Sequence, residues 1–268
     1  MSDFIIRHGE AADIPDLKAL WSRVFGDSDA EIDDFFNTFF DSSICLAAES
    51  DSALAAMGFL LPVGYLRVPG NIDTPCGMIY AIATEPAKRK LGCGSAVTRE
   101  LIDAAKASGI DAVVLHPAEE SLFSYYKNRT ELKTAFFCSE ERISVEPRNG
   151  STLIELSAAE YMDVRAEILK GMPFITFDER CFEYQKRLCG SGGLFMLDGA
   201  SCCAAVEVTD NNVRIIELLG DGEPLLGAIA GAYPAGEYHV RRQGTGTRFG
   251  MIKKGFSMQN GWFGLAFD

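Results

Sequence analysis

A glycine-bearing turn between a predicted strand and a predicted helix constrains the fold of this chain more than any other feature. The apolar stretch 78–84 predicts the strand, and an apolar helical periodicity predicts a helix over 95–108. Free N–H groups at a helix N-terminus carry partial positive charge and attract phosphate. In the turn, Gly92 and Gly94 carry no side chain that would block a diphosphate, and Arg89 adds a positive charge. The pattern therefore favours an α/β unit that binds a phosphate-containing ligand.

Three kinds of phosphate-binding glycine turn follow a strand in this way, and the spacing of their residues distinguishes them. A P-loop requires G-x-x-x-x-G-K-[ST], which this turn lacks. A dinucleotide-binding turn requires a third small residue at its sixth position, where this chain has Val97. The remaining spacing is R-x-x-G-x-G, formed by Arg89, Gly92 and Gly94. The structural alternative, in which the glycines only permit a tight turn, leaves Arg89 and the order of elements unexplained.

The R-x-x-G-x-G spacing resembles the coenzyme A loop of the GNAT N-acetyltransferase superfamily. The resemblance extends through residues 82–94, with Pro86 included, to the apolar strand at 113–115 and the aromatic helix at 123–127. It implies an α/β fold with a mixed (α+β) sheet and direct acetyl transfer from acetyl-CoA to a primary amine of a small molecule or peptide. The rival hypothesis is a noncatalytic acyl-CoA-binding sensor or scaffold protein.

The resemblance also implies which residues bind acetyl-CoA. The backbone over 91–95 would hold the pyrophosphate, and Lys88 or Lys90 would reach the adenosine phosphate. Backbone N–H groups near Ile82 or Ala83 would polarise the thioester carbonyl and stabilise the oxyanion. The residues expected to bind the cosubstrate are Ile82, Ala83, Thr84, Arg89, Lys90, Leu91, Gly92, Cys93, Gly94 and Ser95.

The family's proton-donating tyrosine should come from the aromatic helix predicted over 121–127. By position Tyr126 matches best, and Tyr125 is the alternative, because adjacent residues cannot share one helix face. The Gly-Phe pair that commonly follows this tyrosine in the family is absent, so the sequence does not fix the residue at which the helix ends. No general base is assigned among His116, Glu119 and Glu120, and a nucleophilic role for Cys93 is disfavoured.

The second half of the chain repeats the predicted order of the first: helix, helix, hairpin, strand, turn and helix, strand. We expect a GNAT domain over residues 1–145, a linker over 146–151 and a degenerate GNAT-like domain over 152–268. The second copy should not bind coenzyme A, since Asp221 and Glu223 at the corresponding turn would repel a diphosphate. The glycine-rich stretch 241–248 is interpreted as a solvated loop rather than a second phosphate site.

This arrangement resembles the tandem GNAT proteins of the enhanced-intracellular-survival type, without their sterol-carrier-like domain. In that group the terminal carboxylate can enter the first domain's active site. The apolar tail 262–267 predicts burial, and by this resemblance Asp268 would lie near Tyr126.

Composition limits the partners and the compartment. With 25 basic and 38 acidic side chains, the net charge of −13 argues against nucleic acid or an anionic membrane and suits a cationic amine acceptor. The 8 cysteines lack C-x-x-C spacing and should be packed thiols rather than metal ligands, so no metal is expected. No signal peptide or membrane span is recognised, and a cytoplasmic location and a possible homo-oligomer are the expectations.

Overall fold

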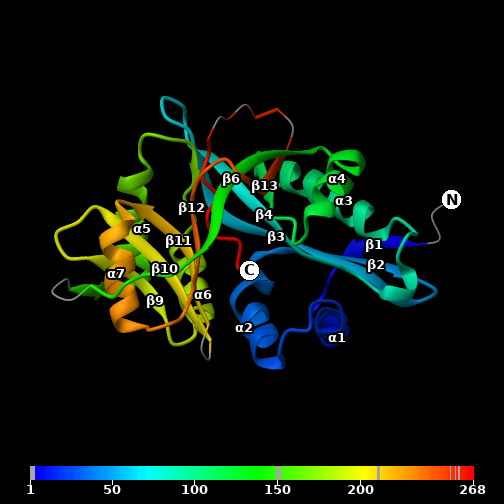
Figure 1. Cartoon of the computed structure of the whole chain (residues 1–268). Helices are drawn as coiled ribbons and strands as arrows, with labels where there is room; N and C mark the ends of the chain where they lie inside the picture. Colours follow the sequence, from blue (N-terminus) through cyan, green and yellow to red (C-terminus); the bar gives the residue numbers. More distant parts are fainter. Residues whose placement is uncertain (1–3, 149–151, 210–211, 254, 257, 259) are drawn as a thin grey trace. The chain divides into compact units, whose positions relative to one another are not determined.

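The computed structural model describes residues 4–148, 152–209, 212–253, 255–256, 258 and 260–268 (Figure 1). The chain separates into two compact units, which are described individually below. The first unit comprises Met1–Val63, Thr74–Thr134 and Met251–Phe256. The second comprises Gly64–Asp73, Ala135–Gly250 and Ser257–Asp268.

The first unit is a sheet covered by helices on both faces (Figure 1). Its strands are β1 (Ile5–His8), β2 (Ile44–Ser50), most of β3 (Ala53–Arg67), β4 (Thr74–Thr84), β5 (Ala112–Leu115) and the end of β13 (Thr247–Lys253). Its helices are α1 (Ile14–Phe25), α2 (Asp29–Phe39), α3 (Cys93–Ala107) and α4 (Glu120–Arg129). Neighbouring strands follow the order β1-β2-β3-β4-β5-β13. The pairs β1–β2 and β2–β3 are antiparallel, β4–β5 is parallel and β5–β13 is antiparallel.

Local signals in the sequence account for the boundaries of the first two helices. α1 has a proline in its first turn and ends at Gly26, which adopts the left-handed conformation. α2 begins with a capping box between Ser28 and Glu31. Asp13 precedes α1, but its side chain makes no cap bond to this helix and pairs with Arg7 instead.

The second unit is also a sheet with helices. Its strands are most of β6 (Leu132–Ile143), β7 (Leu153–Glu155), β8 (Phe174–Ile175), β9 (Gly193–Leu197), β10 (Cys202–Thr209), β11 (Asn212–Gly220), β12 (Tyr238–Gln243) and the start of β13. Its helices are α5 (Ala158–Leu169), α6 (Glu179–Leu188) and α7 (Gly222–Ala232). The strand order is β6-β12-β11-β10-β9-β7, and β8 pairs with the end of β3. A capping box between Ser157 and Glu160 opens α5.

The two units repeat one topology. In the second unit, β7–β9, β9–β10 and β10–β11 are antiparallel and β11–β12 is parallel, which matches the series β1, β2, β3, β4, β5 of the first unit. Each parallel pair then meets an antiparallel strand from the other half of the sequence: β13 pairs with β5, and β6 pairs with β12. The fold is therefore α/β with two tandem units of one topology, as predicted. The boundary predicted at 146–151 stays a prediction, and its residues 149–151 lie outside the described part.

Residues 65–67 belong to β3, which contains Gly64 at φ +128°, a conformation that glycine adopts readily. The stretch 241–248, expected to be a solvated loop, is a loop only over residues 244–246, because β12 extends to Gln243 and β13 starts at Thr247. Arg241 is only 4% exposed, since Glu140 and Asp268 pair with it. The tail 262–267 is buried, as predicted.

Candidate functional site

Strand β4 continues beyond its partner β5 in the first unit. The parallel pairing runs from Cys76 and Ala112 to Ile79 and Leu115, where β5 ends, while β4 extends to Thr84. Backbone groups of β4 beyond Ile79 therefore lie past the end of β5. This is the arrangement in which an extended ligand can add its own polar groups beside a strand.

A residue with a left-handed backbone conformation changes the face of the sheet on which the side chains at the end of β4 lie. Ala81 has φ +50°, which is rare for a residue with a side chain and typical of a β-bulge. Tyr80 packs on Trp21 and Phe35 of the α1–α2 layer, with ring centroids 5.9 and 5.4 Å apart. Ile82, two residues later, packs instead with the core cluster of α3. The bulge thus returns Ile82 to the face that carries α3.

The N-terminus of α3 meets this part of β4. Gly92 is the N-cap with φ +90°, and no side chain caps the helix. A Cβ added to Gly94 would lie 2.9 Å from Thr84 Oγ1 and 3.7 Å from Ile82 Cγ2. Gly94 is therefore required for the close approach of the helix to β4, and the uncapped amides remain available to an anion. The structure brings Ile82, Thr84 and Gly94 together, as the sequence suggested.

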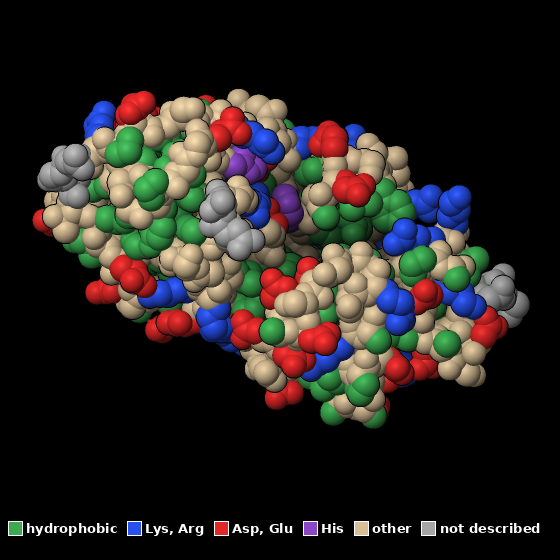
Figure 2. All heavy atoms as spheres, turned by 60° about the horizontal axis from the view of Figure 1, so that its bottom comes forward, with side chains coloured by type: hydrophobic (Ala, Val, Ile, Leu, Met, Phe, Trp, Pro, Cys, Tyr) green, Lys and Arg blue, Asp and Glu red, His purple; other side chains and the backbone are tan. Residues whose placement is uncertain are grey.

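The basic side chains in the turn before α3 differ in their exposure and in whether they pair with an acidic residue. Arg89 and Lys90 are exposed, and Lys90 has φ +71°. Lys88 forms an ion pair with Asp51 in the β2–β3 turn, so its ammonium is held by the protein itself. Leu91 is 54% exposed. Arg89 and Lys90 are thus better placed than Lys88 to meet a phosphate. On the face drawn in Figure 2, basic and acidic side chains lie scattered among apolar ones.

The first turn of α3 is secured from inside. Cys93 and Ser95 are buried, and Ser95 Oγ donates to Gly92 O at 3.0 Å. Thr98 Oγ1 donates to Gly94 O at 2.8 Å, a supporting residue that the sequence pattern did not identify. Burial raises the pKa of the Cys93 thiol, which keeps it protonated and disfavours a nucleophilic role.

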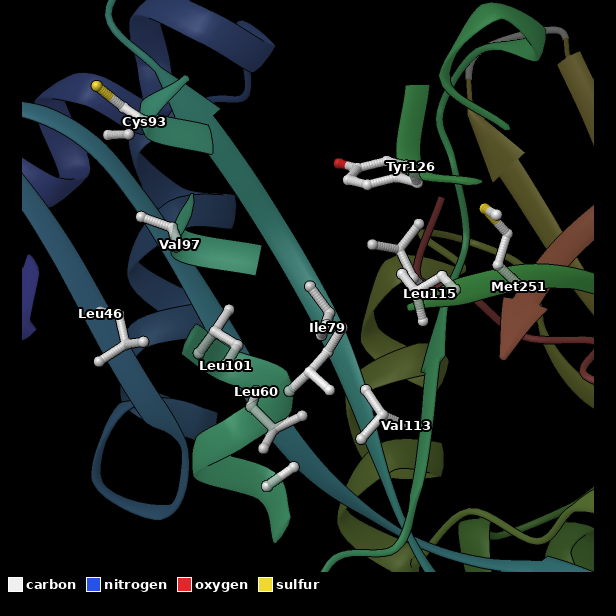
Figure 3. Close-up of a cluster of buried hydrophobic side chains, with 14 of the residues drawn as sticks. Leu46, Leu60, Ile79, Cys93, Val97, Leu101, Val113, Leu115, Tyr126 and Met251 are labelled. Carbon is white, nitrogen blue, oxygen red and sulfur yellow. The ribbon is translucent and has the colours of Figure 1, made fainter. Parts of the chain in front are cut away.

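The two tyrosines of α4 lie in different environments. Tyr126 is 6% exposed and belongs to the same core cluster as Ile79 and Leu115 (Figure 3). Burial, followed by the neighbouring Tyr125, raises its pKa and keeps the phenol protonated. Tyr125 is half-buried, and its hydroxyl would lie 3.8 Å from a Cβ added to Gly94. Tyr126 is therefore a buried member of the core, whereas the hydroxyl of Tyr125 faces the glycine turn.

The end of α4 is stabilised without the Gly-Phe pair. Thr130 Oγ1 donates to Tyr126 O at 2.7 Å and accepts from Leu132 N at 3.2 Å. This threonine closes the helix and starts β6, so α4 runs to Arg129, beyond the predicted end. Glu119 is the N-cap residue of α4 and, like Glu120, is exposed. The general base remains unassigned.

The second unit differs at the corresponding turn. β11 ends at Gly220, and α7 begins at Gly222 with Glu223 in its first turn. Glu223 accepts from Arg242 Nη1 at 3.0 Å. A Cβ added to Gly222 would lie 2.7 Å from the Leu218 side chain. An acidic turn packed against leucine offers no basic cradle, in contrast to the turn at Arg89.

Two features are absent from the described residues. None of their helices is long and apolar enough to cross a membrane. They contain no group of three or more His, Cys, Asp or Glu side chains that could hold a metal ion. All 8 cysteines are described, and each is buried and unpaired with another cysteine.

Known structures share this fold over most of the chain. A probable N-acyltransferase from Enterococcus faecalis has a TM-score of 0.73 and 14% identity, covering 93% of this chain and 72% of that one. A GCN5-related N-acetyltransferase from Kribbella flavida has a TM-score of 0.70 and 14% identity, with 93% and 70% covered. Eis1 from Mycobacterium abscessus has a TM-score of 0.56 and 13% identity, with 92% and 66% covered. Because the sequence identities are low, the similarity to these structures shows only the fold class, which is a pair of GNAT-like units.

The first unit also resembles a known family by sequence. Residues 5–129 match the acetyltransferase (GNAT) domain family. This part of the chain is therefore similar to that family, as its strand, glycine turn and aromatic helix indicated. No curated protein matches the chain.

Proposed function

We propose that this protein is an acetyl-CoA-dependent N-acetyltransferase whose first unit is catalytic. One observation carries the proposal: the uncapped N-terminus of α3 meets the end of β4 at Gly94, just where β4 has passed its pairing with β5. A diphosphate on the helix amides and a pantetheine beside β4 both fit this arrangement. The second unit is proposed to be noncatalytic, because Asp221 and Glu223 replace the basic turn.

In this proposal the backbone over 91–95 holds the pyrophosphate, and Arg89 and Lys90 supply positive charge. Ile82 and Thr84 face the pantetheine, and the N–H groups near Ile82 and Ala83 stabilise the oxyanion. The acceptor is a primary amine, which attacks the thioester directly and displaces the thiolate of coenzyme A. An acidic chain suits a cationic amine.

Tyr126 is the proposed proton donor to the departing thiolate. Its place in the same core cluster as Ile79 and Leu115, the last paired residues of β4 and β5, supports this role. Tyr125 is assigned to cosubstrate binding, because its hydroxyl faces Gly94 and Thr84 at the helix N-terminus.

The two tyrosines can be separated kinetically. Tyr126→Phe should lower kcat about 100-fold with little change in acetyl-CoA affinity, since loss of a general acid removes transition-state stabilisation. Tyr125→Phe should raise the KM for acetyl-CoA and leave kcat within about three-fold. Steady-state kinetics and direct acetyl-CoA titration of both variants measure this. The reverse pattern would exchange the two roles.

The second candidate function is a noncatalytic acyl-CoA sensor, which the burial of Tyr126 favours. Both functions predict that Arg89→Gln weakens coenzyme A binding, and unchanged binding would refute the site. Only the enzyme releases free thiol from acetyl-CoA with an amine. A thiol-release screen over polyamines, aminoglycosides, amino acids and peptides distinguishes them, and coenzyme A binding without thiol release from any class would favour the sensor.

A further inference from the structure

A row of nitrogen-bearing side chains crosses the sheet of the second unit and includes none of the residues of the proposed acetyl-CoA site. Arg142 of β6 lies opposite His239 of β12, and His239 lies opposite Arg214 of β11. Residues directly opposite on neighbouring strands project from the same face. The row therefore places a positively charged guanidinium on each side of His239.

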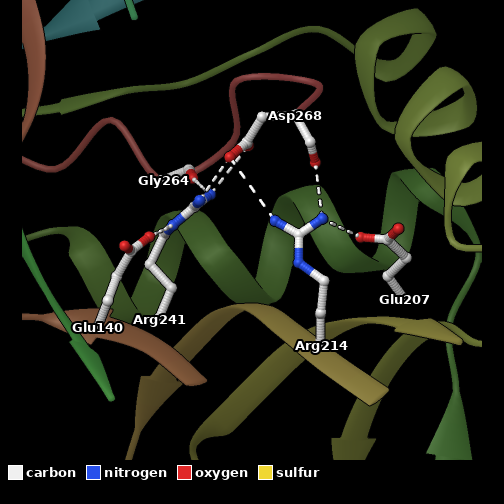
Figure 4. A network of polar contacts seen from close by, with 6 residues as sticks. All are labelled: Glu140, Glu207, Arg214, Arg241, Gly264 and Asp268. Carbon is white, nitrogen blue, oxygen red and sulfur yellow. Dashed lines mark hydrogen bonds and ion pairs between the residues drawn. The ribbon is translucent and has the colours of Figure 1, made fainter. Parts of the chain in front are cut away.

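Acidic side chains of the protein pair closely with Arg214, at one end of this row, and only weakly with Arg142, at the other end. Arg214 Nη1 donates to Glu207 Oε2 at 2.9 Å, and its guanidinium also contacts Asp268 (Figure 4). Arg142 pairs only weakly with Glu237: the closest N–O distance is 3.8 Å, and the side chains are 74% and 57% exposed. Exposed pairs of this kind contribute little, so a ligand can displace Glu237 at low cost.

The row lines a hollow of a size that suits a small ligand. Arg142, Asn212, Arg214, Glu237 and His239 enclose a pocket of about 290 Å³. This is at the lower end of small-molecule sites, too small for a coenzyme and large enough for an oxyanion with a short carbon skeleton. Guanidinium groups present paired N–H donors that match the two oxygens of a carboxylate or phosphate.

We propose that the pocket lined by Arg142, Arg214 and His239 binds a small ligand through a carboxylate or phosphate group. Arg142 supplies the main charge, His239 and Asn212 add polar contacts, and Arg214, held by Glu207, forms the rigid wall. The site belongs to the second unit alone and does not depend on the proposed enzymatic function.

Isothermal titration of the full chain with inorganic phosphate and with succinate tests the proposal, with sodium chloride matched for ionic strength. At least one probe should bind, and Arg142→Gln should weaken it about five-fold, the effect of one exposed charged contact. Lys170→Gln is the matched control, because Lys170 is also 74% exposed and paired with an exposed glutamate. It should leave binding unchanged. The tighter probe distinguishes phosphate from carboxylate.

Three outcomes would overturn the site. The first is that neither phosphate nor succinate binds above the chloride background. The second is that Lys170→Gln weakens binding as much as Arg142→Gln does, which would indicate general charge screening. The third is phosphate binding that survives Arg142→Gln but disappears in Arg89→Gln, which would assign it to the glycine turn. Thermal unfolding of each variant should match the wild type, since both substituted side chains are exposed.

Discussion

Single backbone conformations shape the candidate site. Gly92 starts α3 with φ +90°, Lys90 precedes it with φ +71°, and Ala81 bends β4 with φ +50°. All three lie in the left-handed region, which glycine adopts readily and in which the side chains of Lys90 and Ala81 are strained. Strain of this kind persists only where the surrounding structure stabilises it, and here it clusters around the place where β4 meets α3.

Gly92→Ala tests the conformational requirement without a steric clash, because a Cβ there would have no neighbour within 4 Å. We expect the free energy of unfolding to fall by about 1 kcal/mol, the cost of a left-handed alanine. Urea denaturation measures it. Gly236→Ala is the control: it also has open space and no left-handed φ, so its stability should be unchanged or slightly higher. Equal stability of the two variants would contradict the argument.

Charged side chains join separate elements in both units. In the first unit, Arg7 of β1 donates to Asp13 at 2.6 and 2.8 Å and also pairs with Glu49 of β2. In the second, Glu217 of β11 is fully buried and accepts from Arg165, Tyr161 and Trp262. Arg165 also donates to Phe263 O at 3.1 Å, so this cluster holds α5, β11 and the tail 262–267 together.

The Arg7 cluster should make stability sensitive to acid. The hydrogen bonds from Arg7 lower the pKa of Asp13 from 3.8 to about 2. The pair therefore stabilises the folded chain above about pH 4, and this is lost as the pH falls through about 2. Asp13→Asn should lower the free energy of unfolding at about pH 7 and converge with the wild type near pH 2 in urea titrations. Asp33→Asn, at an exposed pair with Lys18, should change much less, and a constant difference across pH would refute this origin.

Removing Glu217 should be far more costly than removing an exposed glutamate. Glu217→Ala leaves Arg165, which is 1% exposed, without its carboxylate, and breaking a buried pair in this way costs about 3–5 kcal/mol. Glu167→Ala removes the exposed partner of Lys170 and should cost less than about 0.5 kcal/mol. Equilibrium urea unfolding measures both. If Glu217→Ala does not fold, Glu217→Gln should fold with intermediate stability; wild-type stability in either variant would contradict the role.

At the scale of the whole molecule, the two units do not correspond to two continuous halves of the sequence. The first unit includes Met251–Phe256, and Met251 and Ile252 pair with Leu115 and Val114 of β5. Met251 is fully buried in the core of this unit. A fragment that ends before β13 lacks this strand and leaves β5 with an open apolar edge.

A fragment of residues 1–145 should therefore be poorly folded or aggregated, while the same fragment with residues 247–256 attached by a flexible Gly-Ser linker should recover a cooperative transition. Circular dichroism with thermal unfolding, and size-exclusion chromatography, measure this. A stable, monomeric fragment 1–145 would show that β13 is dispensable and would support the predicted boundary at 146–151.

Much of the fold could be predicted because its signals are local. The capping boxes at Ser28 and Ser157, the glycine after α1 and the apolar stripes of the helices act within a few residues of one another. The bulge at Ala81, the strand β13 and the burial of Arg241 could not be predicted, because each depends on residues far away in the sequence. Arg241, for example, lies in a stretch whose composition indicates a solvated loop, but in the structure it pairs with Glu140 and Asp268.

The sequence by itself determined the strand, glycine turn and helix that resemble the GNAT family and the repeated order of elements, since these follow from short-range pattern and turn chemistry. The tertiary structure alone decided which face Ile82 presents, which tyrosine of α4 is buried with Ile79 and Leu115, and which faces Gly94. It also decided that Asp268 lies with Arg241 and Arg214 in the second unit, while its approach to Tyr126 stays a prediction. The physical reason is that burial and pairing are set by contacts between distant segments, and a local pattern does not contain them.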